Sequence, residues 1–557
     1  MCTLRVGDAS PERHLSPQAR LSVRAAFCLS VPLVYGALST QRSFATLVAL
    51  GALWGISQDG LDRWRIRSSR MLGVALTAPL GIIIGSEFMT LVHSSWAFVT
   101  VVGLVAVAAG VIEASLWSTA GMYLLLGAII GGGLGFAGRT WPAALLICAG
   151  VLWVYVVASL TDRRSRVLDQ RATLFHAYRA LANLLEGLAT TRAEELRARA
   201  VALLDATQDV IGTEVPDTHD HESIALYQCF VVALQFGELS SYLASKRQPA
   251  DPAVGDALRA IGAAIRYGTA GDGLAEIERQ SALVGASGDA GARHVAAALR
   301  YPAPTALSRV EPFRKTISRL PMVERLRFAF MLAGAIVVAT IVARTLEGPK
   351  GYWLPMSVAF ILRPDLGPVM RRAVARTIGT LAGVAIAALV ALSGNSEVLL
   401  IALSCAMAAA VPWAAQRSHA LTVMVFTPIV FVFIAVVGSD QNLFGARIVD
   451  TALAALIVLT IDYVFWLHAP SLRPRQLVEV ARRATVRYQE ASADSDLLVR
   501  HSLRRNALRA VTRARSSIDQ ADSEPHLFSS VDGTLRPQLD QLVTLIDQHT
   551  QQLVEAG

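Results

Sequence analysis

Residues 361–379 read ILRPDLGPVMRRAVARTIG and place four arginines, one aspartate and two prolines between apolar stretches. The apolar run that leads into them, about 352–362, is too short to cross a bilayer, because a spanning helix needs roughly 20 apolar residues. The apolar run that follows, about 374–393, is long enough to cross. This order predicts a short helix, a charged break and a full-length helix.

The composition of the whole chain is that of a membrane protein. Hydrophobic residues make up 53% of the 557 residues and charged residues only 17%, with a mean hydropathy of +0.46. Soluble globular proteins of this length are less apolar. The first twenty residues are polar and do not resemble a cleavable signal. The net charge of +8 lies mostly beside apolar runs, which favours membrane topology over nucleic-acid binding as its cause.

Twelve apolar runs predict an all-α, polytopic membrane protein with about twelve transmembrane helices. Two of these runs, in corresponding positions, are shorter than the rest. The runs form two groups of six with the approximate bounds 22–39, 43–56, 71–90, 95–113, 117–136 and 141–160, then 326–344, 352–362, 374–393, 396–414, 419–438 and 445–467.

Polar sequence separates and follows the two groups. Segments 162–320 and 470–557 repeat apolar residues at helical spacing among charged ones, which predicts soluble amphipathic helices. The expected organisation is a cytoplasmic tail at 1–20, a six-span unit at 21–161, a helical cytoplasmic domain at 162–322, a second six-span unit at 323–468 and a helical cytoplasmic C-terminal domain at 469–557.

The two groups of runs share residues in the same order, which predicts an internal repeat. At an offset of 306, Asp59 matches Asp365, Arg65 matches Arg371, Arg70 matches Arg376 and Gly73 matches Gly379. Towards the ends the offset drifts, so that 24–27 matches 327–330, Arg139 matches Arg447 and Tyr155 matches Tyr463.

Arginines are concentrated in alternate connections between the runs. The positive-inside rule therefore predicts that both termini and both helical segments lie in the cytoplasm. Six spans per half is an even number, so both halves run in the same sense. The repeat is then parallel, with its pseudo-twofold axis along the membrane normal.

The charged break at 361–379 is the candidate site. The two short runs, 43–56 and 352–362, occupy matching positions, and paired interruptions of this kind indicate the central site of a transporter. Pro364 and Pro368 cannot continue a helix, and a helix that restarts after them would present free N–H groups to an anion. Arginine suits a carboxylate because its planar fork bonds both oxygens.

The alternative is that both charged breaks are ordinary cytoplasmic loops, in which Asp365 neutralises an arginine. The anion-path candidates come from both breaks. They are Trp353, Arg363, Asp365, Arg371 and Arg376 in the second half, and Asp59, Arg65 and Arg70 in the first.

Carboxylates within the last apolar run are candidates for proton coupling, because a charge at membrane depth is costly. Asp462 has apolar neighbours and no basic residue within one helical turn. Asp450 lies three residues after Arg447 on the same helix face, so a structural ion pair is an equally good interpretation.

Tryptophans and glycines in the apolar runs have structural interpretations. Trp54, Trp353 and three other tryptophans lie near predicted span ends, which favours an interfacial belt for most of them, although Trp353 could also stack on an aromatic ligand. The run GGGLG at 131–135 favours close helix packing over phosphate binding, since no Lys-Ser/Thr follows it.

Several of these residues carry a family resemblance. Trp353, Arg363-Pro364-Asp365 and Arg376-Thr-Ile-Gly379-Thr380 followed by Gly383 resemble the signature of the fusaric acid resistance (FUSC) and aromatic acid exporter family. Arg447-Ile-Val-Asp450-Thr451 is similar to a second pattern of that family, and plant aluminium-activated malate transporters are more distantly similar. The first half departs from the motif, because Val74 follows Gly73. The resemblance implies export of small aromatic or other organic acids across the bacterial inner membrane.

We therefore expect a secondary exporter of small organic anions that is linked to protons. An organic-anion channel is the first alternative, and a membrane scaffold with a partner-binding helical domain is the second. Expected partners are the anion and the lipid bilayer, with a homo-oligomer and a periplasmic accessory protein left open and no nucleic acid.

Neither a catalytic constellation nor a P-loop occurs in the sequence, so we expect no enzymatic activity and no cofactor. The five cysteines lack paired spacing, and His219-Asp220-His221 lies in a polar stretch. Neither feature has the ligand spacing of a metal site, so no metal is expected.

Overall fold

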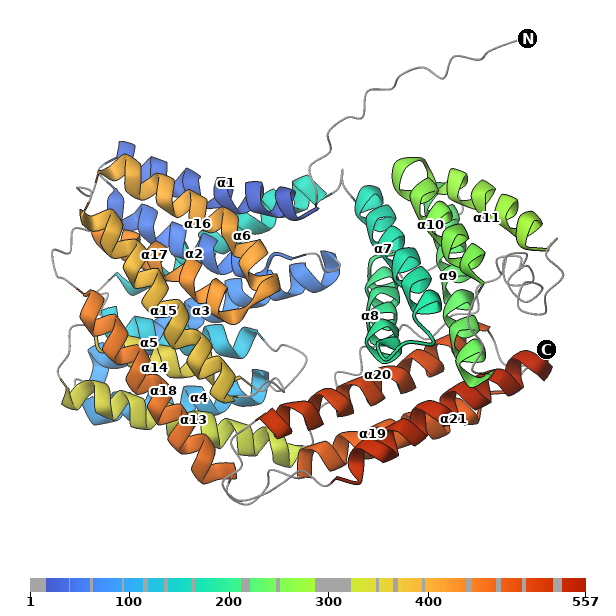
Figure 1. Cartoon of the computed structure of the whole chain (residues 1–557). Coiled ribbons are helices and arrows are strands. Elements are labelled where there is room, and N and C mark those ends of the chain that lie inside the picture. The colour runs from blue at the N-terminus through green and yellow to red at the C-terminus, as the bar shows by residue number, and fades with distance from the viewer. Residues whose placement is uncertain are drawn as a thin grey trace, which may run out of the picture. The chain divides into compact units, whose positions relative to one another are not determined.

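A computed structural model provides the structure of this chain. The residues it describes are 17–39, 41–60, 64–92, 95–113, 119–134, 139–162, 166–211, 221–246, 251–285, 322–346, 350–363, 369–392, 396–436, 443–466, 472–492, 497–523 and 533–556. Within these residues there are twenty helices and no strand, which confirms the all-α prediction. The chain divides into two compact units (Figure 1).

The first unit takes residues 1–160, 320–364 and 369–462 and carries the two groups of apolar helices. In the first group these are α1 (Pro17–Leu38), α2 (Arg42–Gln58), α3 (Trp64–Val92), α4 (Ser95–Glu113), α5 (Ala120–Leu134) and α6 (Thr140–Asp162). In the second group they are α13 (Met322–Thr345), α14 (Trp353–Ile361), α15 (Val369–Leu392), α16 (Glu397–Arg417), α17 (His419–Val436) and α18 (Phe444–Trp466).

Eight helices of this unit, in the part of the chain described, are long and apolar enough to cross a membrane: α1, α3, α6, α13, α15, α16, α17 and α18. Two further helices, α4 and α5, contain apolar stretches of 15 to 17 residues at 96–112 and 120–134. The chain is therefore a multi-pass membrane protein. The two runs that the sequence predicts to be short correspond to α2 and α14, of 17 and 9 residues. Among the helices described, only α14 is shorter than α5, which has 15 residues.

Helix contacts follow the same pattern in both groups. Helix α3 packs against α5, and α15 packs against α17. Contacts between the groups are reciprocal, because α1 packs against α16 while α4 packs against α13 (Figure 1). Helix α2 contacts α17, and α14 contacts α5. Each short helix therefore lies against the fifth helix of the other group.

Glycines allow the closest of these approaches. A Cβ at Gly85 on α3 would lie 2.1 Å from the backbone oxygen of Ala128 on α5, and one at Gly131 would lie 2.4 Å from that of Ile82. A Cβ at Gly379 on α15 would lie 2.4 Å from the backbone oxygen of Ala420 on α17. Small residues that let backbones approach are typical of packing between membrane helices. Gly131 of the GGGLG run thus serves helix packing, the role that the sequence favours.

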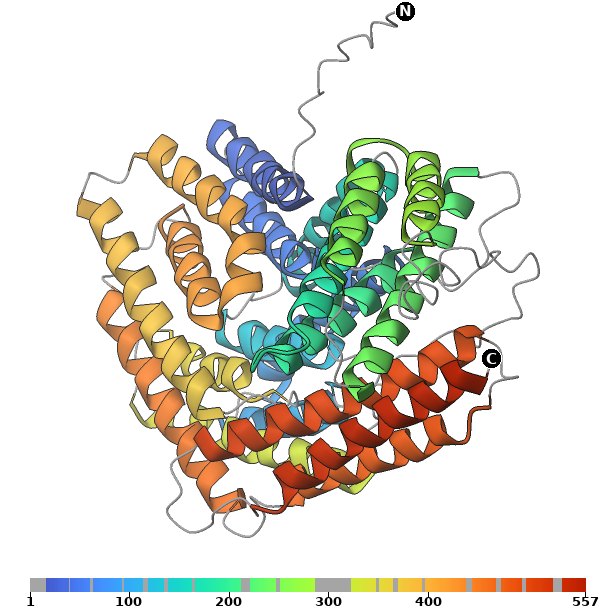
Figure 2. The same ribbon diagram turned by 45° about the vertical axis from the view of Figure 1, so that its right-hand side comes forward.

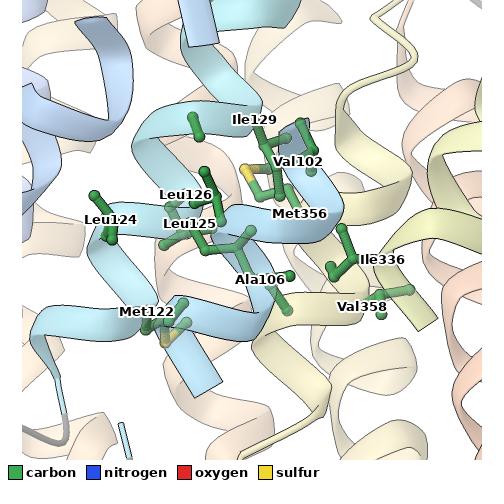
Figure 3. Close-up of a cluster of buried hydrophobic side chains, with 14 of the residues drawn as sticks. Val102, Ala106, Met122, Leu124, Leu125, Leu126, Ile129, Ile336, Met356 and Val358 are labelled. Atoms are coloured by element: carbon green, nitrogen blue, oxygen red, sulfur yellow. The ribbon is translucent and has the colours of Figure 1, made fainter. Parts of the chain in front are cut away.

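The core of this unit surrounds α14. Met356 and Val358 of α14 lie among apolar side chains of α4, α5 and α13 (Figure 3). Eight of the nine residues of α14 are buried. A short helix that is apolar on all sides requires such an enclosed position, because its surface has to be covered by other helices.

The second unit takes residues 161–319, 365–368 and 463–557. Its helices are α7 (Arg166–Glu186), α8 (Ala193–Ile211), α9 (His221–Lys246), α10 (Pro252–Tyr267), α11 (Ala270–Gly285), α19 (Leu472–Gln489), α20 (Leu497–Ser523) and α21 (Leu535–Ala556). The last three pack against one another, as Figure 2 shows in orange and red, and α20 contacts α8 while α21 contacts α9. The two polar segments of the sequence therefore contribute to one compact unit.

Helix α9 differs from what the sequence predicts for this region. Its length and apolar composition match those of a membrane span, and 83% of its most apolar window is buried. Helices α7, α8, α11 and α21 surround it within the second unit. The helix is therefore apolar on all sides because it is the centre of a helical bundle, not because it is amphipathic.

Candidate anion-binding site

Asp59 lies at the C-terminal end of α2, between two arginines. The Nε of Arg24, on α1, donates to its Oδ2 at 2.6 Å, and Nη1 of Arg67, on α3, donates to its Oδ1 at 2.8 Å. Arg67 also donates to the carbonyl of Gly60 at 2.9 Å. All three charged side chains are buried. One carboxylate therefore holds three helices together and partly neutralises two guanidinium groups.

A neutral polar cluster lies directly before Asp59 on α2. The Ser57 hydroxyl lies 2.6 Å from the hydroxyl of Tyr123 on α5, and the Gln58 side-chain amide donates to the same Tyr123 oxygen at 3.1 Å. The Tyr123 ring meets the Trp54 ring edge-on, with centroids 5.4 Å apart. These contacts satisfy the buried tyrosine hydroxyl.

In the second half, one face of α14 carries Trp353, Ser357 and Phe360. These residues are spaced i, i+4 and i+7, so they lie in line along the helix. Trp353 is the largest side chain that is almost fully buried, at 1% exposed. Its ring meets the Phe431 ring of α17 at a centroid distance of 6.0 Å.

Each aromatic ring on this face carries a guanidinium group. The guanidinium of Arg447, on α18, lies 5.1 Å from the centroid of Trp353, and that of Arg376, on α15, lies 4.6 Å from the centroid of Phe360. Both arginines are buried, at 5% and 4% exposed. Such cation–π contacts hold a desolvated cation in place but do not neutralise it.

Neither of these two guanidinium groups forms an ion pair with any carboxylate in the described part of the chain. Arg376 has Arg447 and Arg363 as its charged neighbours, which repel it. Its Nε and one Nη of Arg447 are buried without a hydrogen-bond partner. The hydroxyls of Ser357 on α14 and Thr380 on α15 are buried and unsatisfied in the same way. Buried polar groups normally have partners, so these four atoms mark a place where an acceptor is missing.

The other anion-path candidates have different surroundings. Arg363 and Arg371 are exposed, and a neighbour of Arg371, Arg372, donates to the carbonyl of Arg363 at 3.5 Å. Arg70 is half-buried. Asp365 and the side chain of Arg65 lie outside the described residues. The structure thus brings Trp353 and Arg376 together with Arg447, and it places Asp59 in a separate cluster.

The two proton-coupling candidates lie on α18. Asp450 is half-buried and lies close enough to Arg447 for electrostatic attraction, but the two form no direct ion pair. The side chain of Asp462 lies outside the described residues. Arg447, which the sequence pairs with Asp450, instead contacts the ring of Trp353.

The prediction of an interfacial position is wrong for two of the tryptophans. Trp54 and Trp353 are 6% and 1% exposed and pack inside the bundle. Both lie on the short helices α2 and α14, which the other helices enclose. Trp141 is 61% exposed, as a residue of such a belt would be.

The second unit contains a buried charge cluster of its own. Glu238 on α9 forms an ion pair with Arg500 on α20 at 3.1 Å, and Asp547 on α21 pairs with Arg197 on α8 at 2.9 Å. His501 lies beside Glu238, and burial lowers the pKa of His501 to about 3, so it is neutral at pH 7. Acids and bases are paired here, and the cluster is a structural link between the helices of this unit.

Sequence reasoning missed several residues of both clusters. In the sequence, Arg24 and Arg67 contribute only to the positive-inside pattern. In the structure, both bind Asp59. Phe360 and Ser357 carry a usable signal, because they lie seven and four residues after Trp353, on its helix face. No sequence spacing connects Phe431 with Trp353, since they come from different helices.

One family model matches part of the chain. Residues 335–461 match the model of the family described as fusaric acid resistance protein-like. The matched region includes Trp353, Phe360, Arg376 and Arg447, the residues that form the ring-bound arginine pair. No curated protein and no solved structure has a significant match to the chain. The similarity to the fusaric acid resistance protein-like family therefore covers the second group of apolar helices, from α13 to α18.

Proposed function

We propose that this protein is a secondary exporter of small organic anions, such as aromatic carboxylic acids, and binds them at Arg376 and Arg447. It would work without catalysis in the inner membrane of a bacterium, with both termini in the cytoplasm. The family match and the apolar helices support a transport role.

One observation carries the proposal. Two guanidinium groups are buried on aromatic rings without a carboxylate partner among the described residues. Burying an uncompensated charge costs several kcal/mol, so such a pair is retained where a ligand supplies the opposite charge. Arginine forms bidentate hydrogen bonds to carboxylates, and aromatic rings beside it favour ligands with a flat apolar body.

The reciprocal helix contacts support an alternating-access mechanism. Helix α1 contacts α16 and α13 contacts α4. The first helix of each group thus packs against the fourth helix of the other group, as expected for two equivalent six-helix units. Parallel repeats related by an axis along the membrane normal occur in known secondary transporters, with the substrate near the repeat interface. The Trp353 cluster, enclosed by helices of both groups, has a suitable position.

We assign proton coupling to α18. Asp450 attracts Arg447 while it is ionised, and its protonation removes that competing charge. The protonation state of Asp450 therefore changes the charge balance at Arg447 and links the proton to the anion site. Asp462 remains the second candidate on the same helix.

The test is export from proteoliposomes over a panel of aromatic and aliphatic acids, with and without a pH gradient. Arg376→Gln and Arg447→Gln should each lower the export rate roughly ten- to hundredfold, the loss expected for a charge-assisted hydrogen bond. Arg417→Gln is the matched control, because that guanidinium also lies on a ring, Trp413, but both side chains are exposed. If no acid moves faster than through empty vesicles, the transport proposal fails.

Asp450→Asn tests the coupling. Uphill export should be lost while downhill flux persists. Uphill export that survives both Asp450→Asn and Asp462→Asn would rule out a coupling role for these carboxylates, and flux that is passive in the unmodified protein would indicate a channel.

A further inference from the structure

We infer that the site accepts dianions, and that one organic ligand presents one acidic group to Arg447 and a second to Arg376. This inference rests on the proposed transport function and specifies the ligand class. The preferred ligand would be an elongated dicarboxylate whose middle is apolar.

The two aromatic rings that contact the arginines lie apart along α14. Trp353 and Phe360 are seven residues apart on α14, which separates them by roughly 10 Å along the helix axis. The guanidinium of Arg447 lies 5.1 Å from the centroid of the Trp353 ring, and that of Arg376 lies 4.6 Å from the centroid of the Phe360 ring. The two oxygens of a single carboxylate are only about 2 Å apart, given its bond lengths. The two guanidinium groups therefore lie on rings at the two ends of this face, which favours one acidic group for each arginine.

The first half shows what a single carboxylate needs in order to serve two arginines. At Asp59, Oδ2 accepts from Arg24 and Oδ1 accepts from Arg67, at 2.6 and 2.8 Å. Both guanidinium groups converge on one point there. Beside α14 they are held at two separate rings, which fits two acceptors and not one.

The charges around the two arginines also favour a dianion. Arg376 has only positive groups as its electrostatic neighbours among the described residues, and Arg447 has Asp450 at a distance that gives no ion pair. A monoanion would leave one buried guanidinium uncompensated, whereas a dianion neutralises both.

The surface between the two arginines fits the middle of such a ligand. Ser357 lies between Trp353 and Phe360 on the same face, and its buried hydroxyl is unsatisfied. Aromatic side chains and one hydroxyl would therefore contact the part of the ligand that joins its acidic groups. This environment favours an aromatic or otherwise apolar spacer over a strongly hydrated one.

The experiment compares benzoate with the ortho and para benzenedicarboxylates in proteoliposomes containing the full chain. At pH 7.5 every carboxyl group is ionised, because carboxylic acids have pKa values near 4. Para-dicarboxylate should show at least a tenfold higher kcat/KM than benzoate and also exceed the ortho isomer. Arg376→Gln and Arg447→Gln should each reduce this preference about tenfold, while Arg417→Gln should leave it unchanged.

Three results would overturn the inference. Benzoate could be preferred over both dicarboxylates, the ortho and para isomers could be equal, or each arginine variant could lower mono- and dicarboxylate transport by the same factor. In all of these, the transport proposal would still stand, since acids move. If none of the acids moves, the transport function itself fails, and the dianion inference fails with it.

Discussion

At the end of α2, one carboxylate lies between two guanidinium groups, and beside α14 two guanidinium groups lie on aromatic rings. Both places lie at a helix, α2 or α14, in the second position of its six-helix group. At the first, Asp59 forms ion pairs with Arg24 and Arg67. At the second, Arg376 and Arg447 have rings as neighbours and no ion pair with a described carboxylate.

This difference indicates that the two clusters have different roles. A buried carboxylate shared by two arginines ties helices together and has little capacity left for a ligand. Two arginines held only by rings keep their hydrogen-bond donors available. The α2 cluster is therefore expected to serve stability, and the α14 cluster to serve binding. Substitutions in the two clusters should consequently act in opposite directions.

Removing the carboxylate of the first cluster should have the largest effect. Asp59→Ala removes the carboxylate that both buried arginines bind, so the free energy of unfolding should fall by about 3–5 kcal/mol. Unfolding by SDS in mixed micelles measures this loss. Glu397→Ala is the control, because the Glu397–Arg42 pair is exposed and should contribute less than about 1 kcal/mol. Equal effects of the two substitutions would contradict a structural role for Asp59.

Removing a charge from the second cluster should have the opposite sign. Arg376→Met replaces a buried guanidinium that lacks an ion pair among the described residues with an apolar side chain of similar length. Stability should stay constant or rise by about 1–4 kcal/mol, as when buried ionic groups are replaced by packed apolar ones. The same SDS titration, paired with the export assay, should show higher stability together with lost transport. A loss of stability comparable to that of Asp59→Ala would show that Arg376 is structural too.

The helices themselves are predictable from the sequence, because hydropathy and length are local properties. Each of the twelve apolar runs contains a helix within the described residues, and α14, of 9 residues, is short as the sequence indicates. Burial is not local in this way. Trp54 and Trp353 lie near run ends, which resembles an interfacial position, but neighbouring helices enclose α2 and α14.

The charge partners are the least predictable part. Arg24 is 35 residues from Asp59 along the chain, and nothing in the spacing distinguishes it from the other arginines near run ends. Arg447 lies three residues from Asp450, and the helical spacing predicts an ion pair there. The guanidinium of Arg447 instead lies on the ring of Trp353, on α14. Contacts between helices of this kind depend on tertiary packing that a single sequence does not reveal.

Close helix packing at glycines should contribute to stability in the same way in both halves. Gly85→Ala on α3 and Gly379→Ala on α15 would each push a Cβ into a backbone oxygen of the facing helix. Such overpacking should lower the free energy of unfolding by about 1–3 kcal/mol in both cases. Gly334→Ala on α13 is the control, since nothing lies within 4 Å of a Cβ there, and it should raise stability by up to about 1 kcal/mol. A cost in only one half would show that the two helix interfaces are not equivalent.

The smallest expected effect comes from making the first half more like the second. The offset of 308 that relates Arg139 to Arg447 also relates Tyr123 to Phe431, which has no hydroxyl. Tyr123→Phe removes an oxygen that contacts Ser57 and Gln58, but these two still bond to each other at 2.8 Å. Because the remaining groups keep a partner, the loss should be only about 0.5–1.5 kcal/mol, measured by the same SDS titration. Export should be unchanged, since the hydroxyl bonds to Ser57 and Gln58 of α2. A transport defect without a stability defect would instead place Tyr123 on the anion path.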